Sequence, residues 1–293
     1  MGRSMLDLHL HSSHSDGTMT PAQLVDMARQ RGLVLVSITD HDTVSGTGEA
    51  LAAGCRQGVR VLSGLELSVS WHAYQLHLLA YDFDYHNAAL LSGLGVLQEA
   101  RDQRNRKIVD TLAGLGLPVD EDELRVFAGG GQTGRPHIAR LLVAKRVVGS
   151  IDQAFARYLR KGACAYVPRY VFPADQACAL IHGAGGLAVL AHPGQLAIPL
   201  DELAGLLGQL KEHGLDGLET FYPTQKGKQL RQLRALADRF QLLETGGSDY
   251  HGDIRPRTCM AGGPHFTVPG EILTGLQHRW NTNQQQSTGT NDQ

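Results

Sequence analysis

Short apolar segments alternate with helical ones along most of this chain, and side chains that can bind metals follow the apolar segments repeatedly. Residues 5–11 end in His9 and His11, the apolar run 33–38 leads into His41, and the apolar run 187–190 leads into His192. Parallel strands joined by helices bring their carboxyl ends to one edge, where open sheets and α/β barrels place their active sites. The pattern therefore predicts an α/β protein with its functional site at that edge.

The helices of this alternation have clear start and stop signals. Thr20 is an N-cap residue followed by Pro21 at the first helical position, and Gly32 ends the helix. Further helices are predicted over 46–57, 173–183 and about 200–213, and further strands over 59–62, 215–219 and 242–245. Two alternating segments, 67–71 and 75–80, predict a hairpin directly after Glu66.

The character of the chain changes between residues 88 and 159. Helical periodicity, glycine and proline punctuation and several arginines are present there, but no convincing strand pattern. We therefore expect a discontinuous α/β domain formed by residues 5–87 and 165–270, with residues 88–164 as a helical insertion that caps the substrate. The polar stretch 281–293 is expected to be a disordered tail.

Nine potential metal ligands lie at or near the predicted strand ends. Residues two apart in a strand share a face, so His9 and His11 point the same way. Imidazole and carboxylate donors without thiolate suit Mn, Fe or Zn, and nine donors are too many for one ion. A single histidine in an apolar strand is usually structural, but the joint pattern predicts a centre of two or three ions. The candidates are His9, His11, Asp16, His41, Glu66, His77, His192, Asp249 and His251.

Composition and charge exclude several classes of protein. The 27 Lys and Arg residues nearly balance the 29 Asp and Glu residues, which argues against a surface that coats DNA or RNA, so an anionic substrate needs a local basic cluster. The four cysteines have no CxxC spacing, which predicts ordinary buried thiols in a reducing cytosol. No segment has the length and apolarity of a membrane span or a signal peptide. We expect a cytoplasmic protein that does not act at membranes, and the sequence identifies no protein partner.

The segments HLHSSHSDG, ITDHD, GLELS, QLHLLAY, LAVLAHPG and GGSDYH resemble the successive motifs of the PHP family, named for polymerase and histidinol phosphatase. This resemblance implies a distorted barrel of seven βα units with three divalent ions, of which Mn is the first expectation and Fe or Zn the alternatives. It implies one ion on His9, His11, Glu66 and Asp249, a second on Asp16, His41 and His251, and a third on Glu66, His77 and His192.

The insertion contains arginines that could bind a second phosphate. Arg101 and Arg104 share a helix face at i, i+3, where guanidinium groups suit bidentate anion binding. The alternative is a solvated basic stripe paired with acidic neighbours. The segments EARDQRNRK and TGRPHIAR resemble the branch of the family that contains 3′,5′-nucleoside bisphosphate phosphatases and 5′-to-3′ exoribonucleases, which favours anion binding. Arg135 and His137 begin another helix, so an anion could also bind at the N-terminus of that helix. His137 is a further candidate for contacting the scissile phosphate or for protonating the leaving group. Arg169 is either another phosphate or base contact or a packed surface arginine.

A multi-metal site of this kind points to hydrolysis of a phosphate ester by a hydroxide that bridges two of the ions. No GxSxG elbow or Walker loop is present. The first hypothesis is removal of the 3′-phosphate from nucleoside 3′,5′-bisphosphates. The second is 5′-to-3′ exonuclease action on short 5′-phosphorylated RNA, which the same site could combine with the first. Histidinol-phosphate phosphatase is a weaker alternative, because its cationic substrate favours carboxylates. A non-catalytic PHP module, as attached to some polymerases, predicts missing ligands. The residues expected to be catalytic are His9, His11, Asp16, His41, Glu66, His192, Asp249 and His251.

Overall fold

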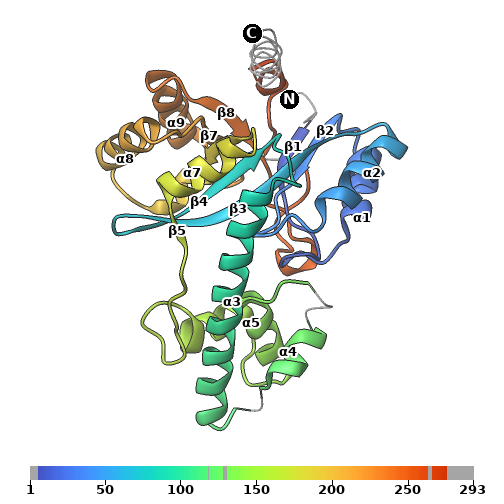
Figure 1. The fold of residues 1–293 in the computed structure, drawn as a ribbon, viewed down its shortest axis with the longest axis vertical. Helices are drawn as coiled ribbons and strands as arrows, with labels where there is room; N and C mark the ends of the chain where they lie inside the picture. Colours follow the sequence, from blue (N-terminus) through green and yellow to red (C-terminus); the bar gives the residue numbers. More distant parts are fainter. Residues whose placement is uncertain (1–5, 118, 128–130, 263–265, 276–293) are drawn as a thin grey trace.

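A computed structural model describes residues 6–117, 119–127, 131–262 and 266–275. The predicted tail 281–293 lies outside these residues. Most of the described chain forms one mixed sheet with helices around it, and a helical segment extends from this body (Figure 1).

The sheet follows the order β1-β2-β3-β4-β6-β7-β8, with the two-residue strand β5 paired to β3. All neighbouring strands on this path are parallel except β4, which is antiparallel to both β3 and β6. The strands are β1 Leu6–Leu10, β2 Leu35–Ile38, β3 Arg60–Trp71, β4 Tyr74–Tyr81, β5 Phe172–Pro173, β6 Leu187–Leu190, β7 Gly217–Phe221 and β8 Leu243–Gly246.

The two ends of the sheet meet. The backbone N–H of Asp249, just after β8, donates to the carbonyl of His9 at 2.8 Å, and the N–H of His11 donates to the carbonyl of Tyr250 at 2.9 Å. This parallel bridge joins the end of β8 to β1. The closed arrangement of seven main strands, with one strand reversed, is the distorted α/β barrel that was predicted.

Helices cover the outer side of the sheet. They are α1 Pro21–Gln30, α2 Thr47–Gln57, α7 Ala174–Gly183, α8 Leu200–Glu212 and α9 Gly227–Arg239. The first of them begins as predicted, because the Thr20 hydroxyl accepts from the Gln23 N–H and the Gln23 side chain accepts from the Thr20 N–H. Strands β1, β2, β6 and β7 are buried on both faces, as expected for parallel strands enclosed by helices.

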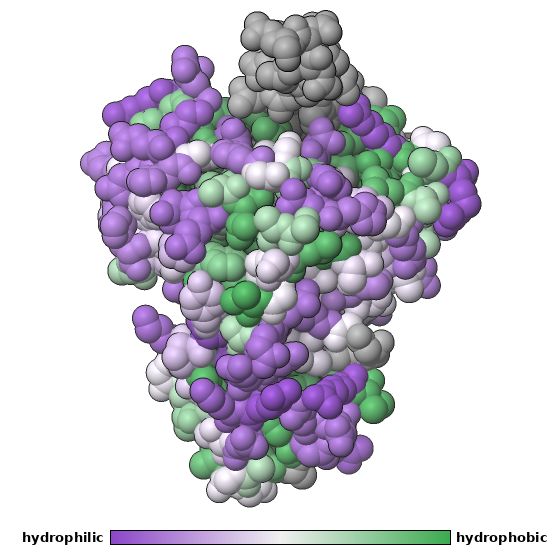
Figure 2. All heavy atoms as spheres, viewed as in Figure 1, coloured by the Kyte–Doolittle hydropathy of each residue, from purple (hydrophilic) through white to green (hydrophobic). Residues whose placement is uncertain are grey.

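Residues 88–159 contain helices and, where the structure describes them, no strand. The long helix α3 Ala88–Gly114 leads away from the sheet to α4 Glu121–Phe127, α5 Arg135–Ala144, α6 Ile151–Ala154 and the π-helical turn η1 Phe155–Leu159 (Figure 1). These helices share a hydrophobic cluster of their own around Ile108, Leu112, Ile138 and Leu142. On the face in Figure 2 their surface is mostly hydrophilic with small apolar areas. We propose that residues 88–164 form a cap on the barrel of residues 5–87 and 165–270.

Two expectations need correction. Glu66 and His77 do not lie at strand ends: β3 continues through Glu66 into the hairpin as one strand, and His77 pairs with Ser68 inside β4. The alternating pattern after Glu66 is therefore the second half of β3.

The four cysteines are free, but only Cys178 is buried; Cys55, Cys164 and Cys259 are exposed. Among the described residues, no helix has the length and apolarity needed to cross a membrane.

Candidate metal centre

The fold brings all nine predicted ligands together at one end of the barrel. His9 lies in β1 and His11 directly follows it, Asp16 lies in the next loop, and His41 follows β2. The hairpin contributes Glu66 and His77, and the segments after β6 and β8 contribute His192, Asp249 and His251. We call these nine residues the ligand cluster.

Glu66 is the centre of the ligand cluster and is 1% exposed. Its Oε2 atom lies 3.3 Å from His9 Nε2, 3.1 Å from His11 Nε2 and 3.1 Å from His41 Nδ1. Its Oε1 atom lies 2.7 Å from His77 Nδ1 and 3.1 Å from His192 Nε2. One carboxylate therefore faces two separate groups of imidazoles, as a ligand shared between ions would.

Asp249 and Asp16 extend the cluster on the other side. Asp249 Oδ1 lies 3.3 Å from both His11 Nε2 and His251 Nδ1 and 3.6 Å from His9 Nε2. Asp16 lies 3.2 Å from His251 Nε2 and 3.9 Å from His41 Nε2. Ligand atoms about 2.0–2.2 Å from one ion are themselves separated by about 3–3.5 Å. The spacings of 3.2 Å and 3.3 Å fit shared coordination, and those of 3.6 Å and 3.9 Å are slightly longer.

The hydrogen bonding of the cluster also fits divalent ions. Seven buried ligand atoms have no hydrogen-bond partner, although buried polar atoms are normally satisfied. They are His9 Nε2, His11 Nδ1, His11 Nε2, His41 Nδ1, Glu66 Oε2, His77 Nδ1 and His251 Nε2. Three groups bring their ligand atoms within 4.8 Å of one another: His11, Asp16, His41 and His251; His9, His11 and Glu66; and His41, Glu66 and His77.

The charges of the cluster favour ionised carboxylates. Burial alone would raise the pKa values of Asp16, Glu66 and Asp249, but the surrounding histidines hold all three well below their usual range. Burial lowers the pKa of His41 to about 3, whereas Asp249 and Glu66, acting against burial, raise the pKa of His11 to about 9. The carboxylates are thus in the charged form that binds metal ions.

Three residues around the site have left-handed backbone conformations that side chains disfavour. Asp42, His192 and Asp249 have φ values of 52°, 30° and 53°. Such strain persists where the surrounding structure enforces it, and it gathers at functional sites. In Asp249 the second carboxylate oxygen accepts from Tyr222 Oη at 2.8 Å and from Arg255, so this ligand is held from behind.

A pocket of about 510 Å³ adjoins the ligand cluster at His77. We call it the anion pocket, because every formal charge on its wall is positive among the residues the structure describes. The charged side chains are Arg104, Arg135, Lys161 and Arg169, and Tyr166 also lines the pocket. Arg101, although predicted to bind substrate, is absent from this wall.

Asp42 forms ion pairs with Arg101 and Arg169. Its carboxylate accepts from the Arg101 guanidinium and from Arg169 Nη1 at 2.7 Å, and it is fully buried. The solvated stripe is therefore the wrong interpretation, since Arg101 and Arg104 are 8% and 5% exposed and neither pairs with an acidic neighbour on α3. Among the described residues, the Arg104 guanidinium donates hydrogen bonds only to the neutral Asn105 side chain, at 3.2 Å and 2.8 Å.

Arg135 and His137 lie at the start of α5, as predicted. Arg135 donates weakly to the Leu159 carbonyl at 3.4 Å, and His137 is 3% exposed with an unpartnered Nδ1 atom. Burial lowers the pKa of His137 to about 4. Its ring is therefore neutral near pH 7.

Sequence reasoning missed three buried carboxylates, Asp40, Asp42 and Glu219. Asp42 stands in the ITDHD segment beside a ligand, and Glu219 interrupts the apolar strand β7. A carboxylate in a strand buried on both faces must have partners, which is the signal that could have identified Glu219.

Convergent imidazoles and carboxylates at one end of a distorted α/β barrel define a metal-dependent hydrolase. The chain belongs to the PHP family: the PHP domain model matches residues 7–164. It is 34% identical over 84% of its length to a 3′,5′-nucleoside bisphosphate phosphatase of Chromobacterium violaceum, of which 87% is covered. It is also 34% identical, again over 84% of its length, to a 5′-3′ exoribonuclease of Haemophilus influenzae, of which 89% is covered.

A solved structure shares the whole architecture. It is that of a Bifidobacterium adolescentis protein with the provisional description of a metal-dependent phosphoesterase. The TM-score is 0.83 at 33% identity, covering 94% of this chain and 96% of the other. The chain is thus an enzyme of the phosphoesterase type, as predicted.

Proposed function

We propose that the chain removes the 3′-phosphate of nucleoside 3′,5′-bisphosphates, for example converting adenosine 3′,5′-bisphosphate to AMP and phosphate. The observation that carries this proposal is a buried arginine without a carboxylate partner, placed in a pocket that opens beside the ligand cluster. The ligand cluster receives the 3′-phosphate, and the anion pocket receives the 5′-phosphate.

The charge balance of the anion pocket supports a bound dianion. Asp42 offsets Arg101 and Arg169, but no carboxylate of the described residues pairs with Arg104 or Arg135. Burial, and then the neighbouring guanidinium groups, hold the pKa of Arg104 well below its usual range. A phosphate bound there replaces the lost hydration of Arg104 and forms charge-assisted hydrogen bonds.

We assign three ions, with Mn first and Fe or Zn as alternatives. His9, His11, Glu66 and Asp249 would hold one; Asp16, His41 and His251 a second; and Glu66, His77 and His192 a third. When bound, the ions supply an acidified water as nucleophile and neutralise the phosphoryl oxygens. The arginines then fix the opposite end of the substrate, so that the 3′-phosphate meets the cluster in one orientation.

His137 contacts the substrate in this proposal as a neutral ring. Because burial lowers its pKa to about 4, it suits a hydrogen bond to a phosphate oxygen better than proton donation to the leaving group. Tyr166 lies in the wall of the anion pocket and offers an aromatic surface to the base.

A second activity uses the same positions. An internucleotide linkage lies at the 3′ oxygen just as a 3′-phosphate does, so the site could also release mononucleotides from short 5′-phosphorylated RNA. The exoribonuclease relative is as similar to this chain as the phosphatase relative. A histidinol-phosphate substrate is disfavoured, because the described wall of the anion pocket presents no carboxylate to its cationic end.

The proposal is tested by two parallel assays on the purified enzyme. One measures phosphate released from adenosine 3′,5′-bisphosphate, and the other measures mononucleotides released from a 5′-phosphorylated RNA oligomer, each with Mn and with excess chelator. We expect chelator-sensitive phosphate release from the bisphosphate. If only mononucleotides are released, exoribonuclease action on RNA replaces 3′-phosphate removal as the proposed function.

A further inference from the structure

A fully buried carboxylate outside the ligand cluster lies directly beneath it. Glu219 is the middle residue of β7 and is 0% exposed. Neither of its carboxylate oxygens belongs to the convergent ligand groups, and no cation other than histidine pairs with it among the residues the structure describes. Its two oxygens serve two different segments.

The first oxygen holds the ring of His9. Glu219 Oε1 lies 2.9 Å from His9 Nδ1. A carboxylate only accepts, so His9 Nδ1 carries the hydrogen and donates it. The Nε2 atom of a neutral His9 is then an unprotonated lone-pair donor, and it faces Glu66 and Asp249 at 3.3 Å and 3.6 Å.

The second oxygen holds the backbone of His192. Glu219 Oε2 accepts from the His192 N–H at 2.6 Å. This residue has the left-handed φ of 30°, a conformation that is strained for a residue with a side chain. The hydrogen bond offsets that strain and aims the imidazole of His192 at Glu66.

The segment after His192 is fastened to β7 as well. Gln225 Oε1 accepts from the Gly194 N–H at 2.9 Å, while Gln225 Nε2 donates to the carbonyls of Glu219 and Thr220. A Cβ atom on Gly194 would lie 2.8 Å from Gln225, so the segment fits closely there.

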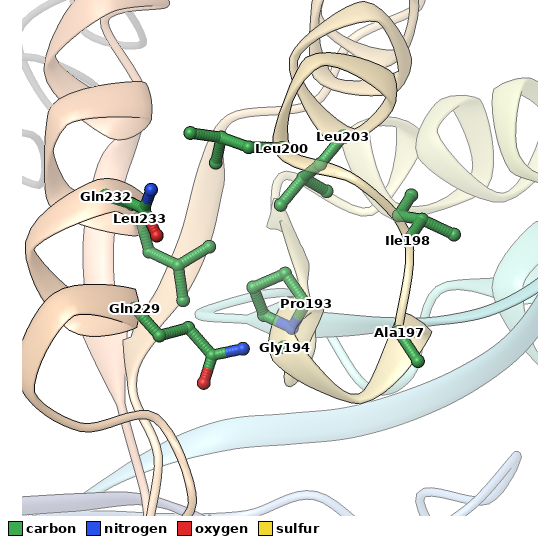
Figure 3. A pocket seen from close by; sticks show the side chains of 9 residues that line it. All are labelled: Pro193, Gly194, Ala197, Ile198, Leu200, Leu203, Gln229, Gln232 and Leu233. Atoms are coloured by element: carbon green, nitrogen blue, oxygen red, sulfur yellow. The ribbon is translucent and has the colours of Figure 1, made fainter.

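The outer side of the same segment is packed less tightly. A pocket of about 130 Å³ lies there. Figure 3 shows Pro193 and Gly194 on one of its sides, across from Leu203 and Leu233. The hydrogen bonds from Glu219 and Gln225 therefore restrain the segment from its inner side.

We propose that Glu219 is the positioning residue that fixes two metal ligands at once, His9 through its ring and His192 through its backbone. The proposal rests on the metal centre of the proposed function. In the assignment above, these two histidines hold different ions, so one carboxylate sets the geometry of both ion sites. Histidine ligands are commonly oriented by such a partner, whose loss costs about 10–100-fold in metal affinity or activity.

Glu219→Gln tests this role with almost no change in shape. Glutamine has one acceptor oxygen and one NH₂ group, whereas the site presents two N–H donors. Either the His192 N–H loses its acceptor, or His9 must move its hydrogen to Nε2 and lose the lone pair that faces the cluster. Glu244→Gln is the matched control, since Glu244 lies on the neighbouring strand β8 and pairs with Thr220 and Arg234 instead.

The experiment measures Mn affinity of both variants by competition with a chelator, together with the ¹⁵N NMR signal of His9 Nδ1, assigned by its absence in His9→Gln. We expect Mn to bind Glu219→Gln at least about tenfold more weakly than the wild type and Glu244→Gln. Equal affinity in all three proteins overturns the proposal.

The NMR measurement keeps the proposal falsifiable if Glu219→Gln does not fold. In the wild type, metal-free or loaded with diamagnetic Zn, we expect a hydrogen on His9 Nδ1 that exchanges slowly with water. A His9 ring whose only hydrogen is on Nε2 overturns the proposal. If the wild type binds Mn but hydrolyses neither proposed substrate, the proposed function fails while both of these measurements still decide the role of Glu219.

Discussion

Replacing Arg104 with methionine separates substrate binding from stability. Arg104 is 5% exposed and has no carboxylate partner among the described residues, and methionine fills a similar length without charge. We expect the Arg104→Met variant to lose affinity for the 5′-phosphate while keeping its fold. Removing the charge should leave the fold intact, because no carboxylate of the described residues offsets it in the free protein.

The magnitudes follow from the two kinds of contact. A hydrogen bond to a charged group contributes about 1.5–3 kcal/mol, so kcat/KM for adenosine 3′,5′-bisphosphate should fall by about 10- to 150-fold. With adenosine 3′-monophosphate, which lacks the 5′-phosphate, the change should be less than about threefold, since no contact to the variant residue is lost. The free energy of unfolding should stay equal or rise, because removing an uncompensated buried cation relieves a desolvation cost.

The assay compares kcat/KM for the two substrates in the wild type, in Arg104→Met and in Arg106→Met. Arg106 is the matched control, since its side chain is 49% exposed on the same helix and pairs with Glu121. Urea unfolding of the same three proteins measures stability. Equal losses on both substrates, or a destabilisation of Arg104→Met above about 2 kcal/mol, would refute the reasoning.

Three further predictions follow from the site. Asp42→Asn leaves the Arg101 and Arg169 guanidinium groups without their carboxylate and should lower the free energy of unfolding by about 3–5 kcal/mol; an unchanged urea midpoint contradicts this. His137 should weaken the metal-free protein at acid pH, because its pKa is about 4 in the folded state and about 6.5 unfolded, so proton uptake on unfolding favours the unfolded chain as pH falls from 7 to 4. The stability of the wild type relative to His137→Leu should therefore fall by up to about 3 kcal/mol over that range, and parallel pH curves would contradict it. Mn at 100 times its Kd should stabilise the folded protein by about 2.7 kcal/mol per site, which is measured as a higher Tm with Mn than with chelator. Equal Tm values would show that Mn does not bind the folded protein in preference to the unfolded chain.

The sequence was sufficient for the main elements of the fold, since their signals are local. The capped helix after Thr20, the buried strands and the hairpin after Glu66 each follow from spacing within about a dozen residues. The position of Glu66 inside β3 was harder to predict, because the strand changes from a buried run to an alternating one without a break. From the hydrophobicity pattern alone, that change is interpreted as the boundary between two strands.

The convergence of the nine residues was predictable because most of them follow buried strands along the chain. The residues that hold the cluster and the arginines in place could not be predicted, since their roles depend on contacts between distant segments. Glu219 meets His9 across 210 positions of sequence, and Asp42 meets Arg169 across 127. For the same reason the sequence could not show that Asp42 forms an ion pair with Arg101 and that Arg104 has no carboxylate partner among the described residues.

The central claim is that the ligand cluster performs the hydrolysis by holding divalent ions. The most direct measurement is phosphate release from adenosine 3′,5′-bisphosphate by protein stripped of metal, with the metal content determined in the same sample, followed by addition of Mn. The account predicts that the stripped protein is folded and inactive, and that Mn restores turnover in the wild type but not in Asp16→Ala or His192→Ala. Near-normal phosphate release by the stripped protein would contradict it.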